Sequence, residues 1–593
     1  AYYPHPKSCI YKLNSSDSHM KFINKILTAG CLALGMGFAM TSCVNDLNVT
    51  PKDPNSFTWA NVEADPDTYL PQVFAKCYSV LAVSGQSGEG SSDMSGLDNG
   101  AGCYPRAIYM LNEFPTDETL WIWADAGVVD IVTGTWANNN VNIYGTYSRL
   151  YIAIALCNDF IRQTLDSGID LTSAVRTEYN NVEQYRLEAR ALRALSYWYV
   201  LDLFGNGGWV DETMDYGESP LPITRKDLYN RLTTELESII AAWPAANAKP
   251  SYGRVGLDGV KALLAKVYLN AKVYTNGEVD AYDKCLALCN EIIDAHKGGG
   301  FQGSGLANNY FALFAAHNDQ YMPGGTNSAE NEILWGIPYD ATNIQAYGGT
   351  RFLMAAAFVN ATMADQNYYM SCLDYGLNDQ WGCMHARAEF SDKFSGTDVR
   401  DDLWSKEAQG FTKENTEFSK FNNGYASVKF TNLIMNDDGS FPKADDSKPI
   451  SVENIAESAK VLNVNAHPDT DLPVFRLADI YLMKAECYVM GGKGNADEAI
   501  AAVNVVRERA GASTWTNVTA NDLLDERARE LYWENHRRTD LVRFNKFTSG
   551  YTWSWKGYVA GGTDMGSHMN VYPIPANVIA AQPEFGAYQN AGY

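Results

Sequence analysis

The chain has 593 residues, of which 46% are hydrophobic and 20% are charged, and its formal net charge is −24. This length and composition are those of a folded globular protein that can bury a large core. An acidic chain without a basic block is poorly suited to nucleic acid or to an anionic membrane surface, which argues against both as binding partners.

The first 57 residues carry export signals rather than a folded domain. Residues 1–19 show no apolar periodicity, and we interpret them as a leader upstream of the true start at Met20. Residues 20–42 combine two early lysines with a mostly apolar stretch and a small-residue end, which predicts a secretory signal peptide. Cys43 follows directly and predicts a lipid-anchored N-terminus, the alternative being an ordinary signal peptide with an incidental cysteine. Residues 43–57 are polar, contain proline and predict a tether.

Helical periodicity of apolar residues returns repeatedly along the rest of the chain. The most apolar of these segments is 185–205, where two adjacent apolar stripes predict a helix buried on most sides and ended by Gly205. The other helical segments should pack around it. The predicted helices cover residues 66–83, 142–166, 185–205, 225–242, 254–273, 280–297, 473–490, 495–511 and 520–548.

Two long segments break the helical period, residues 85–140 and 298–470. The second contains short strand-like runs at 332–335 and 426–434. Short helix pairs with such excursions predict a mainly α fold, a solenoid-like scaffold with long irregular excursions and a few short β-hairpins. Long non-helical excursions on a helical scaffold usually carry the function.

Cysteines and catalytic motifs give little evidence for redox, metal or enzyme chemistry. The eight cysteines after Cys43 form no dense framework, and we expect mostly buried thiols, although Cys372 and Cys383 could pair in an exported protein. Cys285 and Cys289 would need two more ligands to hold a metal ion. No cofactor is expected, and an isolated structural calcium is left open. The metalloprotease, serine-hydrolase and phosphate-loop motifs are missing from the sequence.

The charged block at residues 526–543 offers the one enzymatic alternative, a glycosidase site formed by Glu526, Glu530 and Glu534. Arginines interleave with these three carboxylates and would lower their pKa values, which is unsuitable for a general acid. A structural network of ion pairs is therefore the favoured interpretation.

Seven segments, standing in the family's order, resemble the SusD/RagB family and together extend the resemblance from Cys43 to Tyr593. The resemblance implies tetratricopeptide-like helix pairs in a single domain over residues 58–593, with 298–470 mostly irregular. It also implies a non-enzymatic lipoprotein of the outer bacterial surface that binds glycans and caps a SusC-like TonB-dependent transporter. The segments are EARALRALSYWYVLDLFG, PITRKDLYNRL, GRVGLDGVKALLAKVYLNA, PVFRLADIYLMKAECYV, AIAAVNVVRERAG, ERARELYWENHRRTDLVRF and VYPIPANVIAAQPEFGAYQNAGY.

The early segments CVNDLNVTPKDPN and NEFPTDETLWIWAD look most similar to the starch-binding members, which hold helical glucans against three aromatic residues and an arginine. The matching positions here are Arg106 and Trp123 around NEFPTDETLW, Tyr347 in QAYGGTRFL and Trp381 in LNDQWGCMHAR. An aromatic face can stack on the C–H face of a sugar while polar groups bind its hydroxyls. The alternative for each of these aromatic residues is that it is an ordinary buried core residue without a role in binding.

The sequence departs from this pattern twice. Asp125 and Ala126 stand where a helping asparagine is expected, and residues 361–371 look inserted between the two later aromatic residues. The resulting hypothesis is capture of starch or maltooligosaccharides on the irregular side of the protein, with the helical side facing the transporter. Another glycan, a peptide as in RagB-like members, and a surface glycosidase remain as alternatives.

Overall fold

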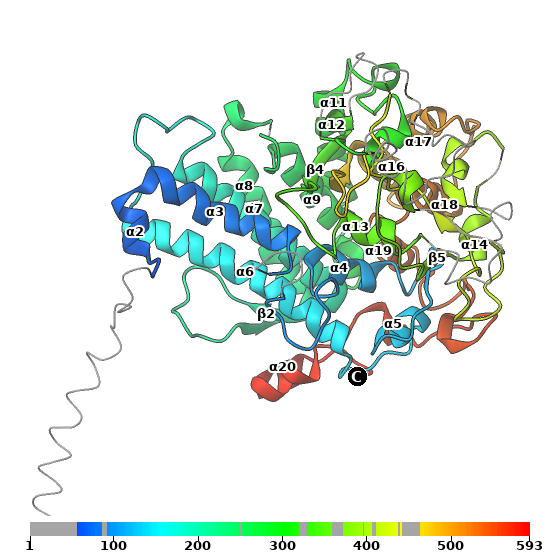
Figure 1. Ribbon diagram of the computed structural model, residues 1–593, viewed down its shortest axis with the longest axis horizontal. Helices are drawn as coiled ribbons and strands as arrows, with labels where there is room; N and C mark the ends of the chain where they lie inside the picture. Colours follow the sequence, from blue (N-terminus) through cyan, green and yellow to red (C-terminus); the bar gives the residue numbers. More distant parts are fainter. Residues whose placement is uncertain are drawn as a thin grey trace, which may run out of the picture. The chain divides into compact units, whose positions relative to one another are not determined.

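The structure is a computed structural model, and residues 62–593 form one compact unit (Figure 1). The predicted leader, signal peptide, Cys43, most of the tether and the segment 361–371 lie outside the residues that the structure describes. The described residues are 56–85, 92–249, 251–319, 329–358, 372–394, 396–405, 411–436, 439, 441 and 463–593.

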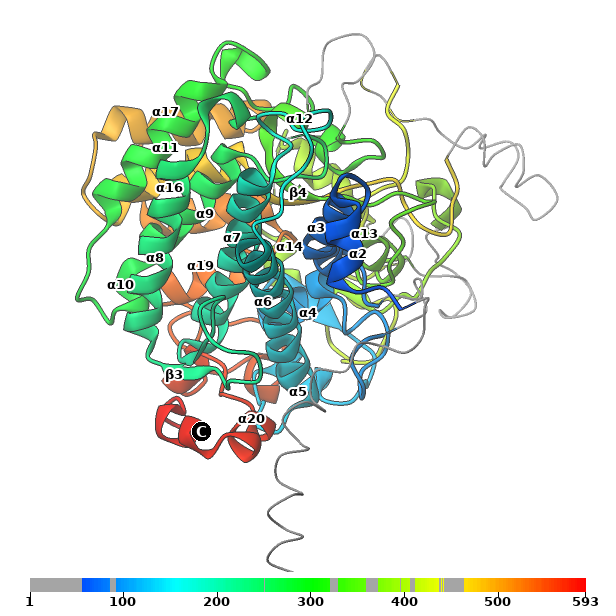
Figure 2. The ribbon, with the colours of Figure 1, turned by 90° about the vertical axis from the view of Figure 1, so that its left-hand side faces the viewer.

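A scaffold of packed helices makes up one side of this unit, and its main members lie side by side in Figure 2. Most predicted helices are confirmed within a few residues. Packing joins the successive pairs α6–α7, α7–α8, α9–α11 and α16–α17, and it also joins α11 to α16, which are remote in the chain. These helices are α3 (Pro66–Ala82), α6 (Val141–Ser167), α7 (Val182–Tyr199), α8 (Arg225–Ala242), α9 (Leu257–Leu269), α11 (Tyr282–His296), α16 (Leu477–Val489), α17 (Ala496–Arg509) and α18 (Ala520–Leu531).

The predicted central helix is α7, and all but three of its residues are buried. It begins with the side chain of Asn181, which accepts a hydrogen bond from the backbone of Gln184. Its last predicted turn is a π-helix, Val200–Phe204, which ends at Gly205 with a φ of 68°. In this wider turn Asp202 is buried and accepts a hydrogen bond from the Tyr274 hydroxyl at 2.8 Å.

Trp198 tests the energetic importance of this helix. Its side chain is 2% exposed, and its indole N–H donates to the Tyr274 hydroxyl at 3.1 Å. Trp198→Ala should lower the free energy of unfolding by about 3–5 kcal/mol, because it leaves a large cavity in a packed core. Urea unfolding followed by circular dichroism measures the change. Leu165→Ala, on the exposed face of α6, should change it by less than about 0.5 kcal/mol, and equal losses would contradict the assignment.

Three predicted helices differ from the structure at their ends. Segment 254–273 is two helices, α9 and α10 (Ala271–Tyr274). Segment 473–490 begins as strand β8 (Leu472–Arg476) before α16, because these residues pair with a distant strand. Segment 520–548 is α18 and α19 (Arg537–Arg543), separated by a bend in which Trp533 and Asn535 have φ values of 61° and 67°.

The expectation of no helix in residues 85–140 is wrong. The structure has α4 (Tyr104–Asn112) and α5 (Val128–Thr133) there. All nine residues of α4 are buried, and the helix is shorter than the roughly 11–18 residues over which a helical period is recognised in a sequence.

The described strands form four two-stranded antiparallel sheets, and two of them join distant parts of the chain rather than hairpins. In the first of these, β1 (Thr119–Trp121) pairs with β5 (Met384–Ala386). In the second, β4 (Ile333–Ile337) pairs with β8, so that Ile333 lies opposite Arg476. The expected hairpin-like arrangement fits only the remaining pairs, β2 (Gly207–Trp209) with β3 (Leu221–Ile223) and β6 (Trp404–Ser405) with β7 (Ala426–Ser427).

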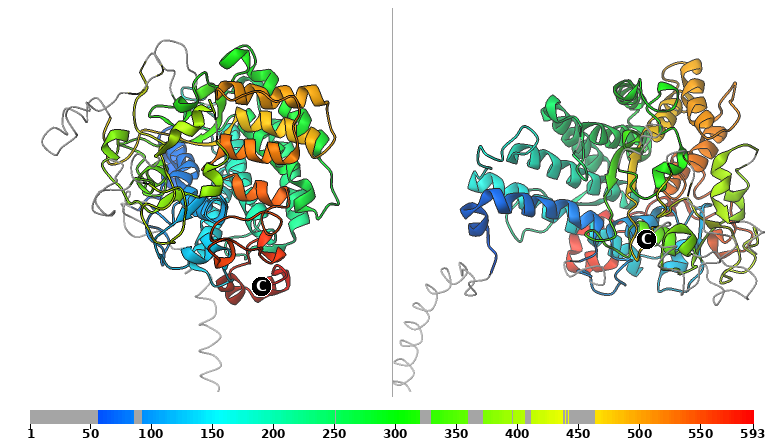
Figure 3. Two further views of the ribbon diagram at one scale, coloured as in Figure 1. Left: turned by 90° about the vertical axis from the view of Figure 1, so that its right-hand side faces the viewer. Right: turned by 45° about the horizontal axis from the view of Figure 1, so that its top comes forward.

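The irregular segments after β4 gather on one side of the compact unit. Figures 2 and 3 show them, in yellow-green, on the side away from α8, α11, α16 and α17. In this region β5 lies beside β1, the short helix α13 (Thr350–Ala355) contacts α4 through Phe352 and Tyr109, and the short helix α14 (Ala388–Ser391) follows β5. Among the described helices, none has the length and apolar character needed to cross a membrane.

Candidate functional site

The pairing of β1 with β5 brings the two irregular regions together. Trp121 lies opposite Met384, and the backbone N–H of Ile122 donates to the carbonyl of Cys383 at 2.9 Å. Trp123 follows this strand by two residues, and Trp381 precedes the partner strand by three. The register of this sheet therefore places two of the predicted site residues in the same neighbourhood.

Phe352 of α13 is the buried centre of the aromatic cluster. Its ring centroid lies 6.0 Å from that of Trp121 and 6.4 Å from that of Trp381. Trp123 contacts Trp121 edge to face, with 5.9 Å between the ring centroids. The backbone N–H of Trp381 also donates to the carbonyl of Ala355 at the end of α13, at 2.6 Å.

Arg106 of α4 lies within this cluster. Its guanidinium carbon lies 5.3 Å from the ring centroid of Trp121, 4.9 Å from Phe352 and 5.7 Å from Trp381. Such cation–π contacts hold the rings around the charge. The side chain is only 9% exposed, and its partner in an ion pair is Asp98 at 3.6 Å. The expectation that Arg106 lies on an exposed face is therefore wrong, because rings on several sides cover its guanidinium.

Tyr347 joins the same neighbourhood through a close approach at Gly100. A Cβ atom at Gly100 would lie 2.5 Å from Nη1 of Arg106 and 3.0 Å from the carbonyl oxygen of Tyr347. A larger residue at this position would therefore require the Arg106 guanidinium to shift. The Tyr347 ring also lies over the guanidinium of Arg351, 4.3 Å from its carbon.

The four predicted site residues thus converge, although they come from segments far apart in the sequence. Trp123, Tyr347 and Trp381 are each partly exposed, whereas Arg106 is buried among rings. Asp125, which stands where an asparagine was expected, accepts a hydrogen bond from the indole N–H of Trp121 at 2.8 Å. This carboxylate therefore already has a partner within the protein.

Two polar residues of this site were missed from the sequence, Arg351 and Asp379. The guanidinium of Arg351 donates to Asp379 Oδ2 at 2.7 Å, and the same oxygen accepts the indole N–H of Trp381 at 2.9 Å. Both residues stand close in the sequence to predicted aromatic residues. Their charge and their spacing from Tyr347 and Trp381 were the available signal.

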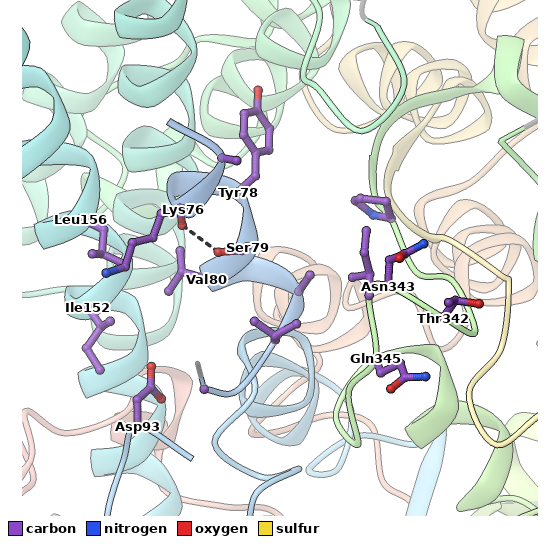
Figure 4. Close-up of a pocket in the computed structure, with 16 residues that line it drawn as sticks. Lys76, Tyr78, Ser79, Val80, Asp93, Ile152, Leu156, Thr342, Asn343 and Gln345 are labelled. Carbon is purple, nitrogen blue, oxygen red and sulfur yellow. Dashed lines mark hydrogen bonds between the residues drawn. The ribbon is translucent and has the colours of Figure 1, made fainter. Parts of the chain in front are cut away.

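A groove of about 890 Å³ lies between α3, α6 and the loop 338–345 (Figure 4). Tyr78, Ser79 and Val80 line one wall, and Asn343 and Gln345 line the other. None of the four predicted site residues lines it. Its lining also includes Gly85 and Asp93, which flank a stretch outside the described residues, and we assign it no ligand.

The carboxylates of the glycosidase alternative are fully buried in an ion-pair network. Glu526, Glu530 and Glu534 bind arginines and one lysine from several segments. Burial favours the neutral acid, but Arg400, Arg529 and Arg507 outweigh it and lower the pKa of Glu526 to about 2. A buried carboxylate with so low a pKa is ionised and inaccessible, so Glu526 cannot serve as a general acid.

The ion pairs predicted within residues 526–543 form only in part. Glu526 binds Arg529 at 2.8 Å, and Asp540 binds Arg543 at 2.7 Å. The bend after α18 separates Glu534 from the following helix, so that Arg537 pairs with Asp117 and Arg538 with Asp202. Glu534 instead binds Arg476 and Lys429.

A second pair of carboxyl groups, Glu113 and Glu118, lies just before β1. Burial, together with the neighbouring Glu118, raises the pKa of Glu113 well above its usual range. Burial raises the pKa of Glu118 to about 8, and Asp117 adds to this while Arg537 opposes it. A raised carboxyl pKa often marks an active site, but both groups are at most 1% exposed. We interpret the two carboxyl groups as part of the folded core, because Glu118 Oε2 accepts a hydrogen bond from the backbone N–H of Trp533 at 3.2 Å.

The structure gives no support to a disulfide or a metal site in the described part of the chain. All eight described cysteines are buried free thiols, so the pairing of Cys372 with Cys383 is not formed. Among the described residues, no three histidine, cysteine or acidic side chains are grouped so that they could hold a metal ion.

Comparison with known proteins places the chain in a family. The model of the SusD family matches residues 331–593. The chain is 32% identical to the starch-binding protein SusD of Bacteroides thetaiotaomicron, over 97% of this chain and 99% of that protein. Among solved structures, it is similar to surface glycan-binding protein A of the same organism, with a TM-score of 0.63 and 20% identity over 88% of this chain and 99% of that one. The same protein in complex with laminarihexaose gives a TM-score of 0.60 and 19% identity, covering 87% of this chain and 97% of that one.

The fold and the site together define a class of protein. In this class a helical scaffold carries a partly exposed aromatic cluster on its irregular side. The chain belongs to the SusD family. This confirms the resemblance drawn from the seven sequence segments, and the mainly α fold agrees with that of SusD superfamily structures.

Proposed function

We propose that this protein is a non-enzymatic, surface-exposed lipoprotein that captures starch or maltooligosaccharides. The observation that carries the proposal is the convergence of Trp123, Tyr347 and Trp381 as partly exposed rings around buried Arg106. Aromatic faces stack on the apolar C–H faces of sugar rings. The 32% identity with a starch-binding protein supports starch as the glycan.

The contacts around these rings support a binding surface that is largely formed before the ligand arrives. Trp121 packs against Trp123, and Phe352 and Arg106 pack against Trp381, which restricts the movement of these two rings. A preformed aromatic surface incurs little ordering cost on binding, which favours a helical glucan. The buried position of Arg106 assigns it to the support of the rings, and stacking then supplies most of the affinity.

A different glycan is the second candidate, and two observations favour it. One structural relative is described in complex with laminarihexaose, and Asp125 replaces the expected asparagine. Peptide binding, as in RagB-like proteins, has no such observation behind it. The buried, ionised state of Glu526 argues against a glycosidase at that position.

Native affinity gels that contain starch, laminarin or other glycans test the proposal. We expect starch to retard the protein, and incubation with starch to release no reducing ends. Retardation by laminarin alone would favour the second candidate, and released reducing ends would favour a glycosidase. A protein that no glycan retards would contradict glycan binding altogether.

The lipid anchor is a separate prediction because Cys43 lies outside the described residues. Cys43→Ala should move the protein from the membrane fraction to the soluble fraction, since several acyl chains on one cysteine hold a folded protein at a bilayer without a spanning helix. Fractionation of cells expressing each variant measures the distribution. Thr50→Ala in the tether should leave the protein at the membrane, and a membrane-bound Cys43→Ala protein would refute the anchor.

Delivery of the glycan requires a partner, which we propose to be a SusC-like TonB-dependent transporter of the outer membrane. The helical side would face this transporter and leave the irregular side open to ligand. Purification from native membranes should recover such a transporter, and its consistent absence would count against this partner.

A further inference from the structure

The carboxylate of Asp379 contacts both Trp381 and Arg351, the residue that packs against Tyr347. Asp379 Oδ2 accepts the indole N–H of Trp381 at 2.9 Å and two N–H groups of Arg351, at 2.7 Å from Nη2 and 3.2 Å from Nε. The other oxygen, Oδ1, accepts the backbone N–H of Gln380 at 2.9 Å. Both oxygens are thus engaged, and the direction of the carboxylate is fixed from several sides.

Arg351 extends this contact to Tyr347. Its guanidinium carbon lies 4.3 Å from the Tyr347 ring centroid, and its Nη1 lies 2.8 Å from Nε2 of His467. His467 contacts the same tyrosine edge to face, with 5.8 Å between the ring centroids. Arg351 and His467 are 8% and 4% exposed, so both support Tyr347 from inside the protein.

The backbone fixes the distance between these groups. The N–H of Asn378 donates to the carbonyl of Asn465 at 3.0 Å, in an isolated bridge that also joins Leu377 to Asn465. This bridge holds the segment before Asp379 beside the segment before His467. Arg351 comes from a third segment, α13. Three separate parts of the chain therefore meet at one ion pair.

The same contacts decide which ring faces remain for a ligand. Arg351 covers one face of Tyr347, and Arg106 lies 5.7 Å from the ring centroid of Trp381. Each ring therefore has one face against a guanidinium and can offer a ligand only the opposite face. The angle and separation of these two faces depend on the shared carboxylate.

We propose that Asp379 and Arg351 are positioning residues that lock the rings of Trp381 and Tyr347 into one rigid binding surface. This proposal rests on the proposed function. It states that the ion pair between Arg351 and Asp379 sets the distance between the rings of Trp381 and Tyr347. Neither side chain needs to touch the glycan. Without Asp379 the indole of Trp381 loses its acceptor and Arg351 loses its anchor, so both rings must be ordered when the ligand binds.

The test is a double-mutant cycle with maltoheptaose as the probe, measured by isothermal titration calorimetry. Asp379→Ala should weaken binding about tenfold, from the cost of ordering two released side chains. Trp381→Phe keeps an aromatic ring but cannot donate a hydrogen bond. In the Trp381→Phe protein, Asp379→Ala should weaken maltoheptaose binding by a clearly smaller factor. The hydrogen bond between the indole N–H and Asp379 is already absent there. Arg351→Lys, which keeps the charge but loses the flat guanidinium, should also weaken binding.

Asp211 supplies a matched control, since its Oδ2 accepts the indole N–H of Trp209 at 2.8 Å away from this site. Asp211→Ala should leave maltoheptaose binding unchanged. The proposal is overturned if Asp379→Ala binds like the unmodified protein, or if its loss is the same in the Trp381→Phe background. It is likewise overturned if the thermal unfolding temperature of Asp379→Ala falls as far as that of Trp198→Ala.

A ligand-free measurement separates this proposal from the proposed function. In protein with ¹⁵N-labelled indoles, the Trp381 resonance is assigned by its loss in Trp381→Phe. Asp379→Ala should shift and broaden this resonance, because the N–H loses a charged acceptor. If the unmodified protein does not bind maltoheptaose but the resonance responds in this way, the glucan assignment fails and the positioning role stands. An unchanged resonance overturns the positioning role whatever the ligand.

Discussion

Glu530→Ala should lower the free energy of unfolding by about 5 kcal/mol or more. Removing one partner of a single buried ion pair costs ~3–5 kcal/mol, because the other charge is left without compensation. Glu530 is fully buried and binds three guanidinium groups, those of Arg400 at 3.0 Å, Arg476 at 3.1 Å and Arg509 at 2.5 Å. Urea unfolding followed by circular dichroism measures the loss, or shows that the variant no longer folds.

Asp525 on the same helix provides the control for this prediction. It binds Lys393 at 2.6 Å but is 43% exposed, so solvent screens the pair. Asp525→Ala should therefore change the free energy of unfolding by less than about 1 kcal/mol. If Glu530→Ala is no more destabilising than Asp525→Ala, the network does not contribute to stability in the way its burial implies.

Trp123→Ala and Trp381→Ala should each weaken maltooligosaccharide binding about tenfold, and the double variant about a hundredfold. Each substitution removes a ring face on which a sugar stacks, and buried aromatic anchors commonly contribute this much to binding. Both rings are partly exposed in the ligand-free protein, so thermal stability should change little. Calorimetric titration and thermal unfolding of the same samples measure the two properties together.

Trp515 is a matched control outside the site. Its ring is also partly exposed, and it lies 3.8 Å from the guanidinium carbon of Arg507. Trp515→Ala should leave glycan binding unchanged. Two results would contradict the site. If the double variant binds glucan as well as the unmodified protein, the proposed site does not bind glucan. If the substitutions destabilise the protein as much as Trp198→Ala does, the two rings are core residues.

The helices that could be predicted from the sequence are those long enough to show a repeated helical period of apolar residues, such as α6, α7, α8 and α11. Helix α4 was missed because its nine residues are fewer than the roughly 11–18 over which a helical period is recognised in a sequence. The bend between α18 and α19 was missed because it depends on a distant contact, the bond between Glu118 and the backbone of Trp533. Strand β8 was predicted as helix because its partner β4 is remote in the chain.

The site could be predicted only as far as the family resemblance reached. That resemblance located the three partly exposed rings and Arg106, but the sequence contains no signal for the rings that bury this guanidinium. The sequence shows Arg351 and Asp379 as charged residues near the predicted rings, but it does not show that they contact each other. This contact exists because α13 and the segment before β5 are brought together by backbone bonds such as that from Trp381 to Ala355.

The pairing of β4 with β8 also bears on how such a protein can diversify. Residues 338–471 leave from one strand and return to the other, so both ends of this excursion are held at neighbouring positions of the helical body. Lengthening a segment whose ends are already fixed is inexpensive, since even a doubling of a flexible loop adds only about 0.6 kcal/mol of closure entropy. The excursion can therefore change in length without moving the two points at which its ends are held. Sequence changes there that keep Arg400, Lys429 and strand β5 would leave the buried ion pairs and the packing of the helices in place.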